Sequence, residues 1–237
     1  MPQLPHISLV LAMSLDGKIA DAQRQPARFG STADLAHLEA RVALADGVLF
    51  GGGTLRAYGS TLSIRNPALI TQRQERGQPD QPLQIVWSPS GQLDPHCRFF
   101  QQPVPRSLVT TLDGARGWQH QGGFQHIWTL PDDQTYPWDW SATLAQLTQA
   151  GLHRLALLGG GRLAAELLRE GLVEEIFITV CPLILGGETA PTPVDGEGFL
   201  AAQAPRLQLI SSQVVGDEVF LHYQVLGQVL RQALGAR

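Results

Sequence analysis

Short apolar runs alternate with segments of helical periodicity along most of the chain. The first run, Ile7–Met13, is apolar apart from Ser8, which is typical of a buried strand. Further strands are predicted at 47–50, 83–87, 107–110, 126–130, 154–158 and 175–180. Several of the segments between these strands show the spacing of amphipathic helices. This alternation predicts an α/β domain with parallel strands.

The end of the chain has a different pattern. Val219, Leu221, Tyr223 and Val225 occupy every second position, and polar residues stand between the last three. This pattern is typical of an antiparallel strand with one face in solvent. No linker rich in proline or serine divides the chain, and no motif recurs at a fixed period. We therefore predict a single domain over residues 1–237, with a mixed, mostly parallel sheet, antiparallel strands at the C-terminal end and flanking helices.

Capping signals place the helices. Ser31 and Asp34 resemble a capping box, so we expect a helix that begins there and ends before Gly47. Its buried face is expected to carry the residues at helical spacing, Leu35, Leu38, Val42 and Ala45. A later helix is expected to be capped by Ser141. Residues 66–82, rich in Gln, Arg, Pro and Gly, predict an exposed excursion.

Composition excludes several classes of protein. Charged residues make up 16% of the 237 positions, the formal net charge is −4 and the pI is near 5.9. No basic stripe is present, which argues against a nucleic-acid-binding protein. The histidines and the two cysteines, Cys97 and Cys181, show no metal-ligand spacing, so we expect no metal site and no disulfide. The run Ile7–Met13 is too short to span a membrane, and we expect a cytoplasmic protein.

Two glycine triplets each separate a predicted strand from a predicted helix. Gly51–Gly53 precede Thr54, and Gly159–Gly161 precede Arg162. At such a junction the free N–H groups and the helix dipole favour an anion, although glycine can also serve only as a steric turn. The triplets and the turn Ser14–Lys18 follow strands, and ligands of α/β sheets bind at the carboxyl ends of strands. We expect the three loops to converge on one crevice and to bind a nucleotide cofactor.

The ordered set of motifs resembles the reductase domain of riboflavin biosynthesis, a relative of dihydrofolate reductase. The matching segments are Ala12–Ala20, Leu49–Leu55, Leu62–Arg65, Gly159–Ala164, Gly171–Ile176 and Pro182–Gly187. The resemblance covers nearly the whole chain. It implies a dihydrofolate reductase-like three-layer fold, a homodimer and an NADPH-dependent oxidoreductase. The zinc signature His-x-Glu…Pro-Cys-x-x-Cys of the deaminase half is absent from the sequence, so we expect a stand-alone reductase.

The resemblance also implies a reaction and a set of site residues. Hydride from NADPH would reach C1′ of a phosphoribosylamino-pyrimidine, whose ribosyl group becomes a ribityl chain. The cofactor would contact Ala12, Gly53, Thr54, Ser88, Gly159, Gly160, Gly161, Arg162, Leu163 and Ala164, with Ala12 against the nicotinamide and Ser88 on the adenosine side. The substrate side would carry Ser14, Asp16, Leu62 and Arg65, with Arg65 as a phosphate clamp.

The proton needed in the reaction would come from water or from a nearby group such as Asp16, the candidate catalytic residue. Each polar candidate also has a plainer interpretation. Asp16 can be only the first residue of an Asp-Gly turn. Arg65 and Arg162 can be solvated surface charges.

Three positions depart from the pattern of the relatives that the chain resembles. Val10 stands where relatives often have a basic residue, and Tyr58 and Leu158 stand where they often have acids. Loss of a charged pair together avoids a buried unpaired charge. The sequence therefore leaves two substrate classes: a phosphoribosylamino-pyrimidine, or another small molecule such as a dihydropterin, a carbonyl or an imine. A nucleotide-binding protein without catalysis is the third hypothesis.

Overall fold

The computed structural model describes residues 3–26, 28–130 and 138–226. Its contacts group the chain into two compact units. Unit 1 consists of residues 1–5 and 37–156, and unit 2 of residues 6–36 and 157–237. The predicted single domain over residues 1–237 stays a prediction, and each unit is described by itself.

Unit 1 is built on parallel strands in the order β5–β4–β3–β2. Their bounds are β2 (Gly47–Gly51), β3 (Leu83–Trp87), β4 (Arg106–Thr111) and β5 (His126–Leu130), each overlapping a predicted strand. Leu49, Ile85 and Leu108 are fully buried. Strands buried on both faces read as continuous apolar runs, which is why the sequence reveals them. The strand β6 (Arg154–Leu157) ends at the border between the units.

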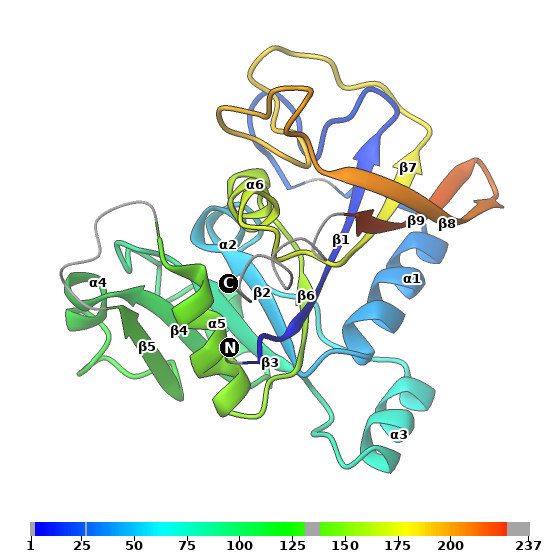
Figure 1. Ribbon diagram of the computed structural model, residues 1–237. Coiled ribbons are helices and arrows are strands. Elements are labelled where there is room, and N and C mark those ends of the chain that lie inside the picture. Colours follow the sequence, from blue (N-terminus) through cyan, green and yellow to red (C-terminus); the bar gives the residue numbers. More distant parts are fainter. Residues whose placement is uncertain (1–2, 27, 131–137, 227–237) are drawn as a thin grey trace, which may run out of the picture. The chain divides into compact units, whose positions relative to one another are not determined.

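Short helices accompany these strands (Figure 1). They are α2 (Gly52–Tyr58), α3 (Pro67–Glu75), α4 (Leu112–Arg116) and α5 (Trp140–Gln149), together with the 3₁₀ turn η1 (Arg98–Gln101). Asp139 caps α5, because its side chain accepts a hydrogen bond from Ala142 N at 2.9 Å. The predicted cap, Ser141, is therefore wrong: it lies inside the helix. Leu144 and Leu147 of α5 are buried.

The segment 66–82 is predicted as an exposed excursion, and most of its residues are exposed, but its first half forms the helix α3, which was not predicted. The helix is anchored by Arg73, which is fully buried. The Arg73 guanidinium donates to the carbonyls of Pro79, Ala43 and Ala45 at 2.7, 3.0 and 2.6 Å. Burial lowers the pKa of Arg73 from its usual value. A cation bound by carbonyl oxygens thus replaces the apolar stripe by which such a helix is normally recognised.

Unit 2 is built on β1 (His6–Ser14), β7 (Glu175–Cys181), β9 (Glu218–Leu226) and β8 (Arg206–Val215), in that order. β1 and β7 are parallel, whereas β9 is antiparallel to both β7 and β8. The predicted α/β class, with parallel strands followed by antiparallel strands at the C-terminal end, is confirmed. The strand β8, drawn in orange in Figure 1, was not predicted; all but its last residue are exposed.

Among the residues of unit 2 that the structure describes, two helices lie wholly or partly in this unit. They are α6 (Gly161–Arg169) and the first part of α1 (Thr32–Ala43). Ser31 caps α1 as predicted, since its Oγ accepts from Ala33 N at 3.1 Å and from Asp34 N at 3.2 Å. Ser31 Oγ also donates to Glu218 on β9 at 2.6 Å.

The predicted buried face of α1 is wrong at its beginning. Leu35 is 51% exposed, whereas Val42 near the end of the helix is buried. Asp34 is turned inward instead and hydrogen-bonds to Thr179 of β7, while burial raises the pKa of its carboxyl. The polar cap residues therefore set the orientation of the first turn, against the apolar periodicity.

Glu174, just before β7, is a half-buried acid that accepts a short hydrogen bond from the backbone of β1. Its Oε2 accepts from Ile7 N at 2.6 Å. Burial raises the pKa of Glu174 from its usual 4.5 to about 7, and the charge of Glu175 acts in the same direction. The Glu174 carboxyl therefore keeps its proton in the folded protein over a pH range in which the unfolded chain has released it. Within that range, rising pH favours the unfolded state.

We predict that the unfolding free energy falls as pH rises from 4.5 to about 7 and that Glu174→Gln removes this component. The glutamine keeps an oxygen that accepts from Ile7 N but cannot ionise. Chemical denaturation across this range measures the effect, with the exposed Glu188→Gln as the matched control. An unchanged pH dependence in Glu174→Gln would contradict the prediction.

Candidate functional site

Ser14 closes the turn after β1 through two hydrogen bonds with Lys18. Ser14 N donates to Lys18 O at 2.8 Å, and Lys18 N donates to Ser14 Oγ at 2.9 Å. Gly17 has φ +77°, in the left-handed region that favours glycine. Ser14 is fully buried. The residues Ser14–Lys18 thus form a fixed turn, and Ala12, half-buried two residues earlier, lies opposite Thr179 of β7.

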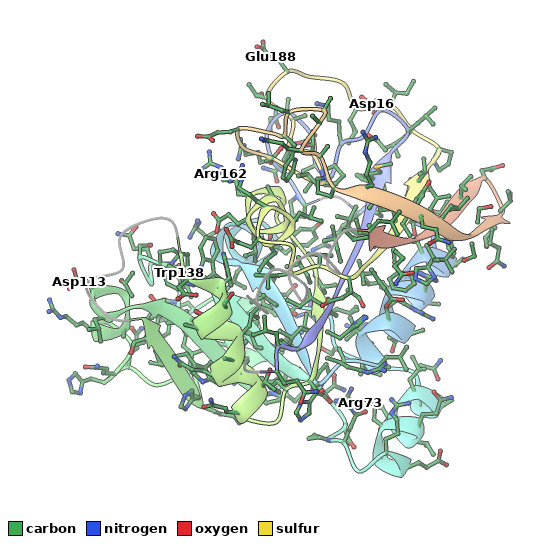
Figure 2. The ribbon with its side chains drawn as sticks, in the orientation of Figure 1. Asp16, Arg73, Asp113, Trp138, Arg162 and Glu188 are labelled. Carbon is green, nitrogen blue, oxygen red and sulfur yellow. The ribbon has the colours of Figure 1, made fainter. Side chains whose placement is uncertain are left out.

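Asp16 organises the segment that follows β7. Its carboxylate accepts from Ser14 Oγ at 2.6 Å, from Leu185 N at 3.1 Å and from Gly186 N at 2.7 Å. These bonds, with that of Ser14 the largest cause, lower the pKa of Asp16 to about 2. The side chain is therefore ionised at neutral pH and is a poor proton donor. The catalytic role of Asp16 stays a prediction, beside its hydrogen bonds to its own turn and to the segment after β7. Figure 2 labels its side chain.

The second glycine triplet begins α6 in unit 2. Gly159 has φ +96°, the Gly159–Gly160 peptide bond is cis, and Gly160 is the N-cap without a side-chain hydrogen bond. Gly159 itself is buried, but a Cβ added there would meet nothing within 4 Å, so there is space on one side of this backbone. Arg162 is exposed on the first turn of α6 (Figure 2), whereas Leu163 and Ala164 are buried. The first turn can therefore offer N–H groups to an anion.

Gly161 has a different reason to be glycine. A Cβ there would lie 2.3 Å from Thr192 O and 2.8 Å from Asp195 Oδ2. The backbone of the loop 182–195 thus contacts α6 directly, and Asp195 N donates to Gly161 O at 3.1 Å. No larger residue fits between the two segments without displacement of the loop.

In unit 1, the first triplet lies against the end of β3. Ser88 is buried, and a Cβ on Gly52 would lie 3.0 Å from Ser88 Oγ. Gly53 is exposed, and a Cβ there would have only Arg56 Nη2 within 4 Å, at 3.9 Å. Thr54 is half-buried in the first turn of α2. The structure therefore brings Ser88 and the Gly52–Thr54 turn together.

Side-chain amides hold the segment that carries Leu62 and Arg65. Gln102 Oε1 accepts from Thr61 N, and Gln81 Oε1 accepts from Ile64 N, both at 2.8 Å. Leu62 is half-buried within this segment and Arg65 is exposed. The backbone N–H of Arg65 donates to Glu39. The segment is thus fixed in unit 1, with Arg65 presented to solvent.

The candidate residues divide between the units. Unit 2 carries Ala12, Ser14, Asp16 and Gly159–Ala164, and unit 1 carries Gly53, Thr54, Leu62, Arg65 and Ser88. The expected convergence of three loops on one crevice concerns both units and stays a prediction, as do the roles of these residues.

Two further observations concern metals and membranes. Within residues 3–26, 28–130 and 138–226, no three His, Cys, Asp or Glu side chains are grouped so that they could hold a metal ion. None of the helices in these ranges is both long and apolar enough to cross a membrane.

Sequence reasoning missed the partners of Asp16 and Gly161. These partners are Leu185, Gly186, Thr192 and Asp195, all in the loop 182–195. The signal that could have found the last two is the spacing Thr192-Pro-Val-Asp195, since Thr, Pro and Asp commonly build turns through their side chains. Asp195 Oδ1 indeed accepts from Thr192 N at 3.0 Å and from Thr192 Oγ1 at 2.7 Å.

Comparison with known proteins identifies the family. Residues 5–221 match the RibD C-terminal domain. The chain belongs to this family. It is 30% identical to the 2,5-diamino-6-ribosylamino-4(3H)-pyrimidinone 5′-phosphate reductase of Archaeoglobus fulgidus, over 83% of this chain and 89% of the relative. The reductase of the same name from Methanothermobacter thermautotrophicus is also 30% identical, over 94% of this chain and 99% of the relative.

Solved structures confirm the fold. A pyrimidine reductase-like protein from Corynebacterium diphtheriae superposes with a TM-score of 0.79 at 18% identity, covering 94% of this chain and 93% of the other. Dihydrofolate reductase from Enterococcus faecalis, complexed with NADP(H), gives a TM-score of 0.53 at 10% identity, covering 94% and 97%. The predicted dihydrofolate reductase-like fold is therefore confirmed, and a reductase family with this fold implies a nicotinamide cofactor.

We predict that Gly161→Ala lowers the unfolding free energy by about 1–3 kcal/mol, because its Cβ meets the Thr192 carbonyl. Gly53→Ala is the matched control, since its Cβ meets only the end of a flexible arginine. Its stability should equal or slightly exceed that of the wild type, because alanine favours helix. Denaturant titration checks both variants, and a Gly161→Ala protein as stable as wild type would contradict the contact.

Proposed function

We propose that the chain is an NADPH-dependent reductase of riboflavin biosynthesis, which reduces the ribosyl group of a phosphoribosylamino-pyrimidine to a ribityl chain. The observation that carries this proposal is the match to two reductases of nearly the same length, 89% and 99% of which are covered. The name of these relatives makes 2,5-diamino-6-ribosylamino-4(3H)-pyrimidinone 5′-phosphate the first substrate to test. The free thiols of Cys97 and Cys181 support a cytoplasmic setting.

The chain has backbone surfaces that suit a dinucleotide. Gly159 and Gly53 each leave one side open, and neither α6 nor α2 has a side-chain cap on its first turn. We propose that NADPH contacts Gly53, Thr54 and Ser88 of unit 1 and Ala12 and Gly159–Ala164 of unit 2. When bound, NADPH supplies the hydride that reaches C1′ of the substrate.

The proposed roles of the chain's own residues are mainly to bind and to orient. Ala12 is small enough to leave room for a flat ring beside β1. Arg65 is exposed on a segment fixed by glutamines, so its planar guanidinium is available for a phosphate. Asp16 holds the Ser14–Lys18 turn and stays ionised. The proton is therefore proposed to come from water, and the rate from orientation of the reactants.

The three positions that depart from the family pattern concern the contacts with the pyrimidine ring. Val10 is 4% exposed and lies opposite Phe177 in the sheet, so a basic side chain there would need a buried partner. Leu158 is half-buried and Tyr58 is partly exposed at the end of α2. We propose that these changes alter contacts with the pyrimidine ring and leave the phosphate contact of Arg65 in place.

The test is NADPH oxidation by the purified protein with the pyrimidinone 5′-phosphate. Arg65→Ala is expected to raise the KM for this substrate about 10- to 100-fold through loss of charge-assisted hydrogen bonds. Its effect on the KM for NADPH should be small. The exposed Arg98→Ala of the same unit is the control.

Several outcomes would contradict the proposal. An Arg65→Ala enzyme with an unchanged substrate KM would remove Arg65 from the site. Turnover of a dihydropterin but of no pyrimidine ribotide would change the substrate class. NADPH binding without turnover of any candidate, and failure to restore growth of a reductase-deficient riboflavin auxotroph, would indicate a binding protein without catalysis.

We also propose that the chain forms a homodimer through the face of β8 and β9 that bears Leu207, Leu209 and Val214. These side chains are 43%, 51% and 73% exposed. They pair with Val225, Tyr223 and Val219 of β9, so the face carries no charged residue. Uncovered apolar faces of this kind are rare in monomers. A neutral face is compatible with a two-fold contact, in which like residues meet across the axis.

Leu209→Lys combined with Val214→Lys is expected to give a monomer in light scattering, because charges of one sign then face each other across the axis. Gln208→Lys is the matched control. Gln208 pairs with Gln224 on the other face of the same strand, so its variant should stay dimeric. A wild-type monomer, or a dimer that survives the double substitution, would reject this surface.

A further inference from the structure

The loop 182–195 joins two parts of unit 2 that the proposed function uses. It leaves β7 at Cys181 and has no regular secondary structure of its own. Its first part contacts the turn after β1, and its last part contacts the start of α6. Figure 2 marks Glu188 on this loop and Asp16 on the turn.

The contacts with the turn are dense. Leu15 N donates to Leu183 O at 2.9 Å, and Ile19 N donates to Pro191 O at 2.9 Å. Lys18 Nζ donates to Ala190 O at 3.3 Å. Asp16 adds the two bonds from Leu185 N and Gly186 N. The loop therefore follows the turn over most of its length, mainly through backbone hydrogen bonds, which persist only while the loop keeps its place.

The contact with α6 depends on Asp195. Its N–H donates to Gly161 O, and its Oδ2 lies against the Gly161 backbone. Its Oδ1 accepts from both Thr192 N and Thr192 Oγ1. These bonds fold residues 192–195 into a compact turn, and the Thr192 carbonyl is pressed against Gly161 as a result. The carboxylate of Asp195 thus shapes the turn that supports the glycine triplet.

We propose that Asp195 is a positioning residue, which through the loop 182–195 fixes the start of α6 relative to the turn that carries Ser14 and Asp16. This proposal rests on the proposed function, in which the start of α6 binds the cofactor phosphates. The nicotinamide and the substrate then lie near the turn that carries Ser14 and Asp16. Hydride transfer requires donor and acceptor to be aligned closely. A change at Asp195 is therefore expected to affect both cofactor affinity and turnover.

Two variants separate geometry from charge. Asp195→Asn keeps an oxygen that accepts from Thr192 but removes the negative charge, whereas Asp195→Ala removes the acceptor as well. The control is Glu188→Ala, which removes an exposed acid from the same loop. Asp195→Ala is expected to raise the Kd for NADPH and to lower kcat, each about tenfold, the loss expected for one or two hydrogen bonds. Asp195→Asn and Glu188→Ala should stay within about threefold of the wild type.

A second measurement needs no cofactor. Amide hydrogen exchange at Leu15 and Ile19, which donate to carbonyls of the loop, reports on the far end of the connection. Asp195→Ala is expected to speed exchange at both amides while the protein stays folded, and Asp195→Asn is expected to leave them protected.

Three results would overturn the inference. Unchanged exchange at Leu15 and Ile19 in Asp195→Ala would show that the loop does not connect the two segments. An equal change of kcat and of the Kd for NADPH in Asp195→Asn and Asp195→Ala, or tighter NADPH binding in both, would show that the negative charge of Asp195 affects the site. The shape of the turn would then not be the cause. If the wild type binds no NADPH, the proposed function fails, and the exchange experiment still decides the mechanical role of Asp195.

Discussion

The carboxylate of Asp16 ties the loop 182–195 to the turn after β1, and the candidate site residues of this turn lie at that connection. An irregular segment such as 182–195 has no hydrogen-bonded ladder of its own, so its backbone N–H groups need other acceptors. Asp16 accepts hydrogen bonds from two of them, those of Leu185 and Gly186, which lie 169 and 170 positions further along the chain. An ionised carboxylate suits this task because it accepts several charge-assisted bonds at once. The same bonds that make Asp16 a poor acid thus make it a good support for the loop.

Glycine serves two different purposes within one triplet. A Cβ at Gly159 would meet no neighbour, whereas the space for a Cβ at Gly161 is occupied by the Thr192 carbonyl and the Asp195 carboxylate. In unit 1, Gly53 is open and Gly52 is packed against Ser88. In each triplet one glycine therefore serves internal packing, and at another an added Cβ would meet no atom closer than 3.9 Å. The surface available to a phosphate is narrower than three consecutive glycines suggest.

The sequence predicted the elements whose burial follows a simple period and missed those that do not. The strands β2, β3 and β4 are buried on both faces and are visible as apolar runs. The helix α3 was missed because its anchor is the guanidinium of Arg73, and β8 was missed because it is almost wholly exposed. At the candidate site, Asp16 and the glycines could be identified by their local motifs. The spacing of Thr192 and Asp195 indicates a turn, but the contact of this turn with Gly161 could not be predicted, because Gly161 lies far away in sequence.

The distribution of charge also bears on how such a site could work. Val10 is buried and apolar, and Asp16 is ionised and bound by N–H and O–H groups. Under the proposed function, Asp16 is a poor proton donor to the substrate at neutral pH, which favours water as the source of the proton. The exposed Arg65 of unit 1 then remains as the candidate contact for the substrate phosphate. Acceleration would come from the fixed placement of cofactor and substrate. The loop 182–195, held by Asp16 of the turn after β1 and by its own Asp195, would provide that placement.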